Sequence, residues 1–76
     1  MLKIILKIKN PLVMKYNRIK ECLVERDLTQ KWLSERLSIS TVTVNMWCKN
    51  KSQPPLKKMF EISEVLEVKP SDLINE

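Results

Sequence analysis

The chain has 76 residues, of which 14 are lysine or arginine and 9 are aspartate or glutamate, so its net charge is +5. This length, with 43% hydrophobic residues, is enough for one small domain with a compact core but not for a large cleft. The sequence has no histidine or glycine and no acidic or cysteine cluster at metal-ligand spacing, so we expect no enzymatic activity, no metal and no cofactor.

The first predicted element is a β-strand within residues 1–13. Apolar residues alternate here with mostly basic ones, namely Leu2, Ile4, Leu6 and Ile8 with Lys3, Ile5, Lys7 and Lys9. The alternation, the β-branched content and Pro11 as a stop favour a strand over a helix. A lone strand is not stable in water, so it would pair with a second chain across a dimer axis or pack as an arm on its own domain. The alternative is a mis-called start, with the true start at Met14.

A helix is predicted from about residue 29 to residue 37. Leu33 and Leu37 lie on one helical face, and Thr29 offers a side-chain oxygen to the free N–H groups of the first turn. Thr29 is therefore the expected N-cap residue.

A second helix is predicted after Ser40, which is the next N-cap candidate. Val44 and Trp47 recur at helical spacing and are expected in the core, while the residues between them face elsewhere. The β-branched run from Val42 to Val44 favours a strand by a few tenths of a kcal/mol per residue, which the cap and the helical period outweigh. Residues 29–48 are thus interpreted as a helix-turn-helix.

Charge is distributed unevenly along the chain. The segment from Ser38 to Phe60 has no acidic residue, and its lysines are Lys49, Lys51, Lys57 and Lys58. From Glu61 onward, acidic residues outnumber basic ones. This pattern suits a helix-turn-helix whose basic segment meets phosphate.

At this point the chain resembles the lambda-repressor/Cro-like family of DNA-binding domains, also called the xenobiotic-response-element type. The resemblance covers Asn17 to Ile74 and rests on several pieces in order: Arg18-Ile19-Lys20-Glu21, Leu28-Thr29-Gln30, Ile39-Ser40, Val44 with Trp47, Lys51-Ser52-Gln53-Pro54, the run from Leu56 to Leu66, and Val68 before Asp72-Leu73-Ile74. It implies an all-α, five-helix domain over residues 14–76. The further helices are expected near 15–26, 55–67 and 70–75.

The resemblance also implies which residues touch DNA. Base contacts are expected from the outward positions of the second helix-turn-helix helix, Thr41, Val42, Asn45 and Met46. Backbone contacts are expected from Gln30, Thr43, Lys49, Lys51, Ser52 and Lys57. For Thr43, the alternative partner of the hydroxyl is the preceding turn. Because Asn pairs with adenine and apolar side chains contact the thymine methyl, we expect a preference for A/T-rich sites.

The chain departs from the family pattern at positions where relatives carry glycine or a buried ion pair. Glycine is replaced by Asp27, Ser38 and Asn50, of which Ser38 is the least suited to a left-handed conformation. A buried Arg–Glu pair is replaced by Leu23 and Cys48, so Cys48 is expected to be a buried structural thiol. With only Cys22 as a second cysteine, no disulfide scaffold is expected.

The function implied is sequence-specific binding of double-stranded DNA by a transcriptional regulator, with repression as the expected output and a homodimer as the expected state. One alternative is the antitoxin of a toxin–antitoxin pair, which would also bind a toxin. Another is a protein-interaction module on the same scaffold. No signal sequence or membrane-length apolar run occurs, so we expect a cytoplasmic, nucleoid-associated protein without a membrane partner.

Overall fold

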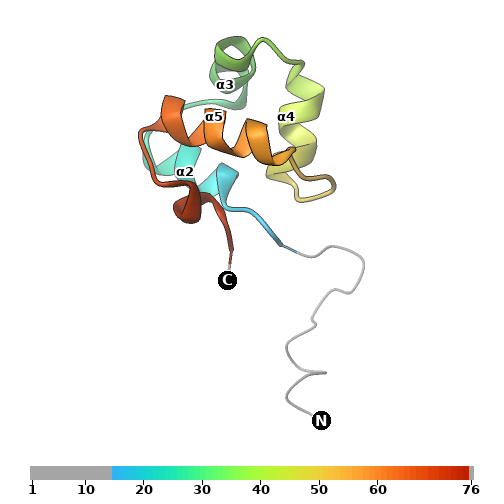
Figure 1. The fold of residues 1–76 in the computed structure, drawn as a ribbon. Coiled ribbons are helices and arrows are strands. Elements are labelled where there is room, and N and C mark those ends of the chain that lie inside the picture. Colours follow the sequence, from blue (N-terminus) through green and yellow to red (C-terminus); the bar gives the residue numbers. More distant parts are fainter. Residues whose placement is uncertain (1–14, 76) are drawn as a thin grey trace.

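The computed structural model describes residues 15–75, and the strand expected within residues 1–13 lies outside this range. The elements in chain order are α2 (Ile19–Glu25), α3 (Gln30–Leu37), α4 (Thr41–Cys48), α5 (Leu56–Leu66) and the 3-10 helix η1 (Pro70–Leu73). In Figure 1, α5 crosses the middle of the molecule, with α3 on one side of it and α2 on the other. The all-α prediction is confirmed.

One apolar cluster lies between the helices. Its fully buried apolar side chains are Ile19, Leu23, Leu33, Val44, Ile62 and Leu73, which come from all five elements. Each contributes about 1.5–3 kcal/mol of burial free energy. Val44 and Trp47, which were predicted for the core, belong to this cluster, as do Leu33 and Leu37, which were predicted to share one helical face.

The predicted N-caps are present at the starts of α3 and α4. The Thr29 hydroxyl oxygen accepts from the backbone N–H of Trp32 at 3.0 Å, and the Ser40 hydroxyl oxygen accepts from the N–H of Thr43 at 3.1 Å. Both capping residues have extended backbone, as an N-cap requires. Helices α3 and α4 therefore begin within a residue of the predicted positions.

The first helix starts later than predicted, at Ile19 instead of residue 15. The reason is tertiary: the N–H of Arg18 donates to the Leu73 carbonyl at 2.8 Å, and the Tyr16 carbonyl accepts from the N–H of Asn75 at 2.8 Å. The backbone that would have opened the helix forms an antiparallel bridge with the C-terminal segment instead. The same bridge ends the last helix at residue 73 instead of 75, and that helix is 3-10.

The four α-helices within residues 15–75 end in the same way, with one left-handed residue. These residues are Asp27, Ser38, Asn50 and Glu67, with φ of 56°, 55°, 59° and 56°. The following N–H then donates to the carbonyl five residues earlier: Leu28 to Leu23, Ile39 to Ser34, Lys51 to Met46 and Val68 to Ser63. This is the Schellman arrangement, which usually uses glycine. The left-handed turns expected at Asp27 and Asn50 are confirmed. Ser38, the residue least suited to this conformation, adopts it as well, and the turn at Glu67 was not predicted.

Candidate nucleic-acid interface

Helix α4 has a buried side and an exposed side. The buried side consists of Val44, Trp47 and Cys48. On the exposed side, Val42 is 71% and Met46 36% accessible, and Thr41 is also exposed. Asn45 is half-buried at the border between the two sides. Three of the four predicted base-contact residues therefore lie on the open face, and the fourth lies at its edge.

Asn45 is held by a residue from the preceding helix. Its side-chain amide Nδ2 donates to Oε1 of Gln30 at 3.0 Å, across 15 positions of sequence. Gln30 is the first residue of α3, and Thr29 caps that helix immediately before it. An amide nitrogen has two hydrogens, so Asn45 keeps one donor and its oxygen, which are the groups that pair with adenine. Gln30 keeps its own amide N–H groups, which are donors that a phosphate accepts.

Thr43 is less available than the other residues predicted to touch DNA. It is half-buried, and its hydroxyl lies 2.9 Å from the hydroxyl of Ser40. Of the two expected partners of this hydroxyl, phosphate or the preceding turn, the described structure contains the contact with the turn.

A basic loop follows α4. Lys49, Lys51 and Ser52 are exposed in it, and Lys57 is exposed in the first turn of α5. No acidic residue occurs between Ser38 and Phe60. The predicted backbone-contact residues Lys49, Lys51, Ser52 and Lys57 are thus all exposed within or just after the loop that follows α4, and we call this stretch the basic edge.

The Schellman turn that ends α4 differs from the other three in one respect. The residue after the left-handed position is apolar and half-buried against the core at Leu28, Ile39 and Val68. A hydrophobic residue is usual at this place. After α4 the equivalent residue is Lys51, which is exposed. The chain therefore has a solvated cation where the same backbone geometry elsewhere carries a packing contact, so the Lys51 side chain adds nothing to the core.

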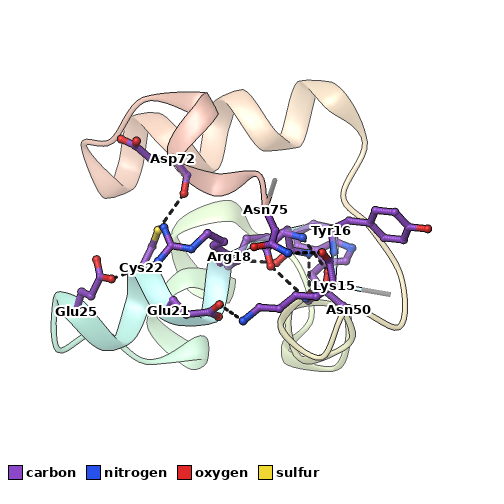
Figure 2. A network of polar contacts seen from close by, with 12 residues as sticks. Lys15, Tyr16, Arg18, Glu21, Cys22, Glu25, Asn50, Asp72 and Asn75 are labelled. Carbon is purple, nitrogen blue, oxygen red and sulfur yellow. Dashed lines mark hydrogen bonds and ion pairs between the residues drawn. The ribbon is translucent and has the colours of Figure 1, made fainter. Parts of the chain in front are cut away.

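A cluster of side-chain amides holds the basic loop against the start of the described chain, as Figure 2 shows in part. Oδ1 of Asn50 accepts from the backbone N–H groups of Tyr16 at 2.8 Å and Asn17 at 2.9 Å. Nδ2 of Asn17, which is only 1% exposed, donates to the Trp47 carbonyl at 2.9 Å and to Oε1 of Gln53 at 2.7 Å. Sequence reasoning assigned Asn50 only a turn conformation and missed this cluster, because Asn17 lies 33 positions from Asn50 and 36 from Gln53.

The two positions at which relatives carry a buried Arg–Glu pair hold buried apolar residues in this chain. Leu23 is 2% and Cys48 6% exposed, and both belong to the core cluster. Burial raises the pKa of the Cys48 thiol to about 11. Both cysteines are free, which agrees with the expectation of a structural thiol and no disulfide.

Two further observations concern the described part of the chain. Within residues 15–75, no His, Cys, Asp and Glu side chains gather in a group of three that would hold a metal ion. None of the helices there is long and apolar enough to cross a membrane.

Comparison with known proteins adds a family and a structural relative. The model of a helix-turn-helix family matches residues 19–73. A crystal structure of a candidate DNA-binding protein from Bacteroides fragilis is similar, with 45% identity and a TM-score of 0.79. The similarity covers 82% of this chain and 100% of that one. None of the curated proteins matches the chain.

Proposed function

The chain belongs to the helix-turn-helix family, and on that premise we propose that it binds double-stranded DNA sequence-specifically and represses transcription. The observation that carries the proposal is the hydrogen bond between Gln30 and Asn45. It joins the start of α3 to Asn45 at the edge of the exposed side of α4, which supports a role for Gln30 at the DNA backbone and for Asn45 at the bases.

Base recognition is proposed for the exposed side of α4, inserted into the major groove. Asn45 would donate to N7 of adenine and accept from N6, while the Gln30 amide restricts its rotation. Val42 and Met46 would contact thymine methyl groups, and the Thr41 hydroxyl would reach a base edge. A site rich in A and T is the expected preference.

Backbone binding is proposed for the residues on either side of α4. They are Gln30 before it and Lys49, Lys51, Ser52 and Lys57 after it, with Thr43 as a secondary contact because its hydroxyl is already bonded to Ser40. Such contacts orient the helix in the groove and supply most of the sequence-independent affinity. Repression would follow from occupancy of a promoter.

A homodimer is proposed because a single α4 reads only a few base pairs. Two copies related by a two-fold axis would place their recognition helices in successive major grooves, about 34 Å apart. The bound site would then be palindromic.

The test is selection from a randomised duplex pool at two salt concentrations, followed by sequencing. A palindromic, A/T-leaning site is expected with the full chain. Lys51→Ala should weaken all duplexes alike and lower the salt slope by about 1, whereas Asn45→Ala should flatten the preference at one position. Absence of enrichment at both salt concentrations would overturn the proposal.

An antitoxin or protein-interaction role is the second candidate. It is favoured by exposed apolar side chains outside α4, at Leu56, Phe60 and Ile74, which are 73%, 49% and 50% accessible. From Glu61 onward acidic residues outnumber basic ones, so this C-terminal segment has a charge opposite to that of the basic edge. A toxin-like reading frame next to this one would support the antitoxin, and loss of salt-dependent duplex binding would support the interaction module.

A further inference from the structure

The end of α4 differs from the other helix ends in what fixes the chain that leaves it. After α2, α3 and α5, an apolar side chain packs against the core, at Leu28, Ile39 and Val68. After α4 this position is Lys51, which is exposed. The backbone of the turn is nevertheless the same, since the N–H of Lys51 donates to the Met46 carbonyl at 3.0 Å. The turn after α4 therefore lacks the packing contact that fixes the other three.

The side-chain amide of Asn50 takes the place of that contact. Its Oδ1 accepts from the backbone N–H groups of Tyr16 and Asn17 (Figure 2), and it also accepts from Nε2 of Gln53 at 3.1 Å. Its Nδ2 donates to the Asn17 carbonyl at 3.2 Å. Within residues 15–75, the side chains of the other three left-handed residues make no hydrogen bond. Only the turn after α4 is thus held through the side chain of its left-handed residue.

Asn17 completes the cluster from its buried side. Its side chain is 1% exposed, and Nδ2 donates to the Trp47 carbonyl at 2.9 Å and to Oε1 of Gln53 at 2.7 Å. Its Oδ1 accepts from the backbone N–H of Ile19, at the start of α2, at 3.0 Å. A side-chain network whose members are all bonded is rigid. The amide cluster of Asn17, Asn50 and Gln53 therefore fixes the loop to both α2 and α4.

The exposed lysines of the loop lie between the fixed points. Lys49 directly precedes Asn50, and Lys51 lies between Asn50 and Gln53. Within residues 15–75, neither lysine forms an ion pair with an acidic residue. Their ammonium groups are therefore solvated, whereas the backbone that carries them is held in place. A ligand that binds both groups has less backbone to order, which lowers the entropic cost of binding.

We propose that Asn50 is a positioning residue for phosphate binding, which holds the backbone of Lys49 and Lys51 in the conformation that meets the backbone of a duplex. The amide replaces an apolar contact, so the side chain that follows the left-handed residue is available to bind an anion. Glycine at position 50 would permit the same turn but would supply no such contact. This inference rests on the proposed function and adds to it a residue that itself touches no DNA.

The test combines Asn50→Gly and Lys51→Gln, singly and together, in binding to a mixed-sequence 30-base-pair duplex over a range of salt concentrations. Lys51→Gln alone should lower the slope of log K against log salt by about 0.9. Asn50→Gly alone should weaken binding to every duplex by roughly 2- to 10-fold, because the loop then has to be ordered on binding. In the Asn50→Gly background, Lys51→Gln should cost less affinity than it does in the unmodified chain.

Two further variants separate positioning from a general loss of stability, and every variant is measured below its own melting temperature. Ser38→Gly is the matched control, because it makes a similar change at the left-handed end of α3. Lys51→Gln should cost the same affinity with Ser38→Gly as without it. Gln53→Ala removes one bond to Asn50 and keeps the turn residue. It should reduce the cost of Lys51→Gln as well, and it carries the test if Asn50→Gly does not fold.

Equal losses from Lys51→Gln in the unmodified, Asn50→Gly and Gln53→Ala chains would overturn the positioning role and leave Asn50 a contributor to stability alone. Unchanged affinity of a folded Asn50→Gly chain would overturn it too. If Lys51→Gln changes neither the affinity nor the slope of the unmodified chain, the phosphate contact of the proposed function fails, and the positioning role fails with it. If Lys51→Gln lowers the slope and the losses are additive, only the positioning role fails.

Discussion

Glu67→Gly, at the left-handed end of α5, should stabilise the domain by about 0.5–1 kcal/mol. A residue with a Cβ pays roughly 1–2 kcal/mol for this conformation, and glycine avoids that cost. Glycine also has more conformational entropy in the unfolded chain, which lowers the net stabilisation by roughly 0.4–1 kcal/mol. The backbone bond from the N–H of residue 67 to the Glu64 carbonyl, at 3.2 Å, does not depend on the side chain.

The same substitution at the other three helix ends gives internal controls. Ser38→Gly should stabilise by a similar amount, because serine has no special tolerance of positive φ. Asp27→Gly should change little, since Asp already visits this region. Asn50→Gly should destabilise by about 1–3 kcal/mol, because it removes two part-buried side-chain hydrogen bonds that are each worth roughly 0.5–1.5 kcal/mol, along with two exposed ones that contribute less.

The assay is thermal and urea unfolding of the four variants. For a domain of this size, 1 kcal/mol corresponds to roughly 4–8 °C in the melting temperature, so the ordering is measurable. A melting temperature for Glu67→Gly at or below that of the unmodified chain would refute the assignment of conformational cost to that residue. Stabilisation by Asn50→Gly would refute the role given to its amide.

Three other predictions follow from the contacts described above. In a double-mutant cycle, Gln30→Ala and Asn45→Ala should be non-additive for binding to the selected site, with Asn45→Ala alone costing about 1–3 kcal/mol of discrimination; additive losses would contradict the coupling of the two amides. Because burial raises the pKa of Cys48 from 9.0 to about 11, its contribution to stability should be constant below pH 9 and fall between pH 9 and about 11. Melting curves of Cys48→Ala should lack this part of the alkaline decline, and an identical decline would contradict it. Ser40→Ala should cost about 1 kcal/mol in urea unfolding through loss of the α4 cap, and a cost near zero would show that the cap is dispensable.

The helix-turn-helix could be predicted from sequence because its determinants are local. Thr29 and Ser40 cap the two helices, each by accepting a hydrogen bond from the backbone N–H three residues later. The spacing of Val44 and Trp47 alone indicates the buried side of the second helix. The left-handed turns at Asp27 and Asn50 also followed from the conformational tolerance of Asp and Asn.

The remaining features depend on residues that meet only in the folded chain. No helix begins at residue 15, because the N–H of Arg18 donates to the carbonyl of Leu73, 55 positions away. The Asn50 side chain accepts hydrogen bonds from Tyr16 and Asn17, which lie more than 30 positions away. No local sequence pattern predicts that pairing. Glu67 gave no signal because glutamate is not a residue that favours positive φ.

The bridge between Asn17 and Ile74 has a practical consequence for labelling and fusion. It brings both ends of the described domain together, next to Asn50. In Figure 1 these ends are the blue start and the red end of the coloured ribbon, below α2. A bulky tag that follows the described C-terminal end would begin beside Tyr16 and Asn50, close to the edge proposed to bind DNA. A reporter group is better introduced at Glu64 or Glu67, which are exposed on and just after α5, because neither residue is part of the proposed DNA-binding edge.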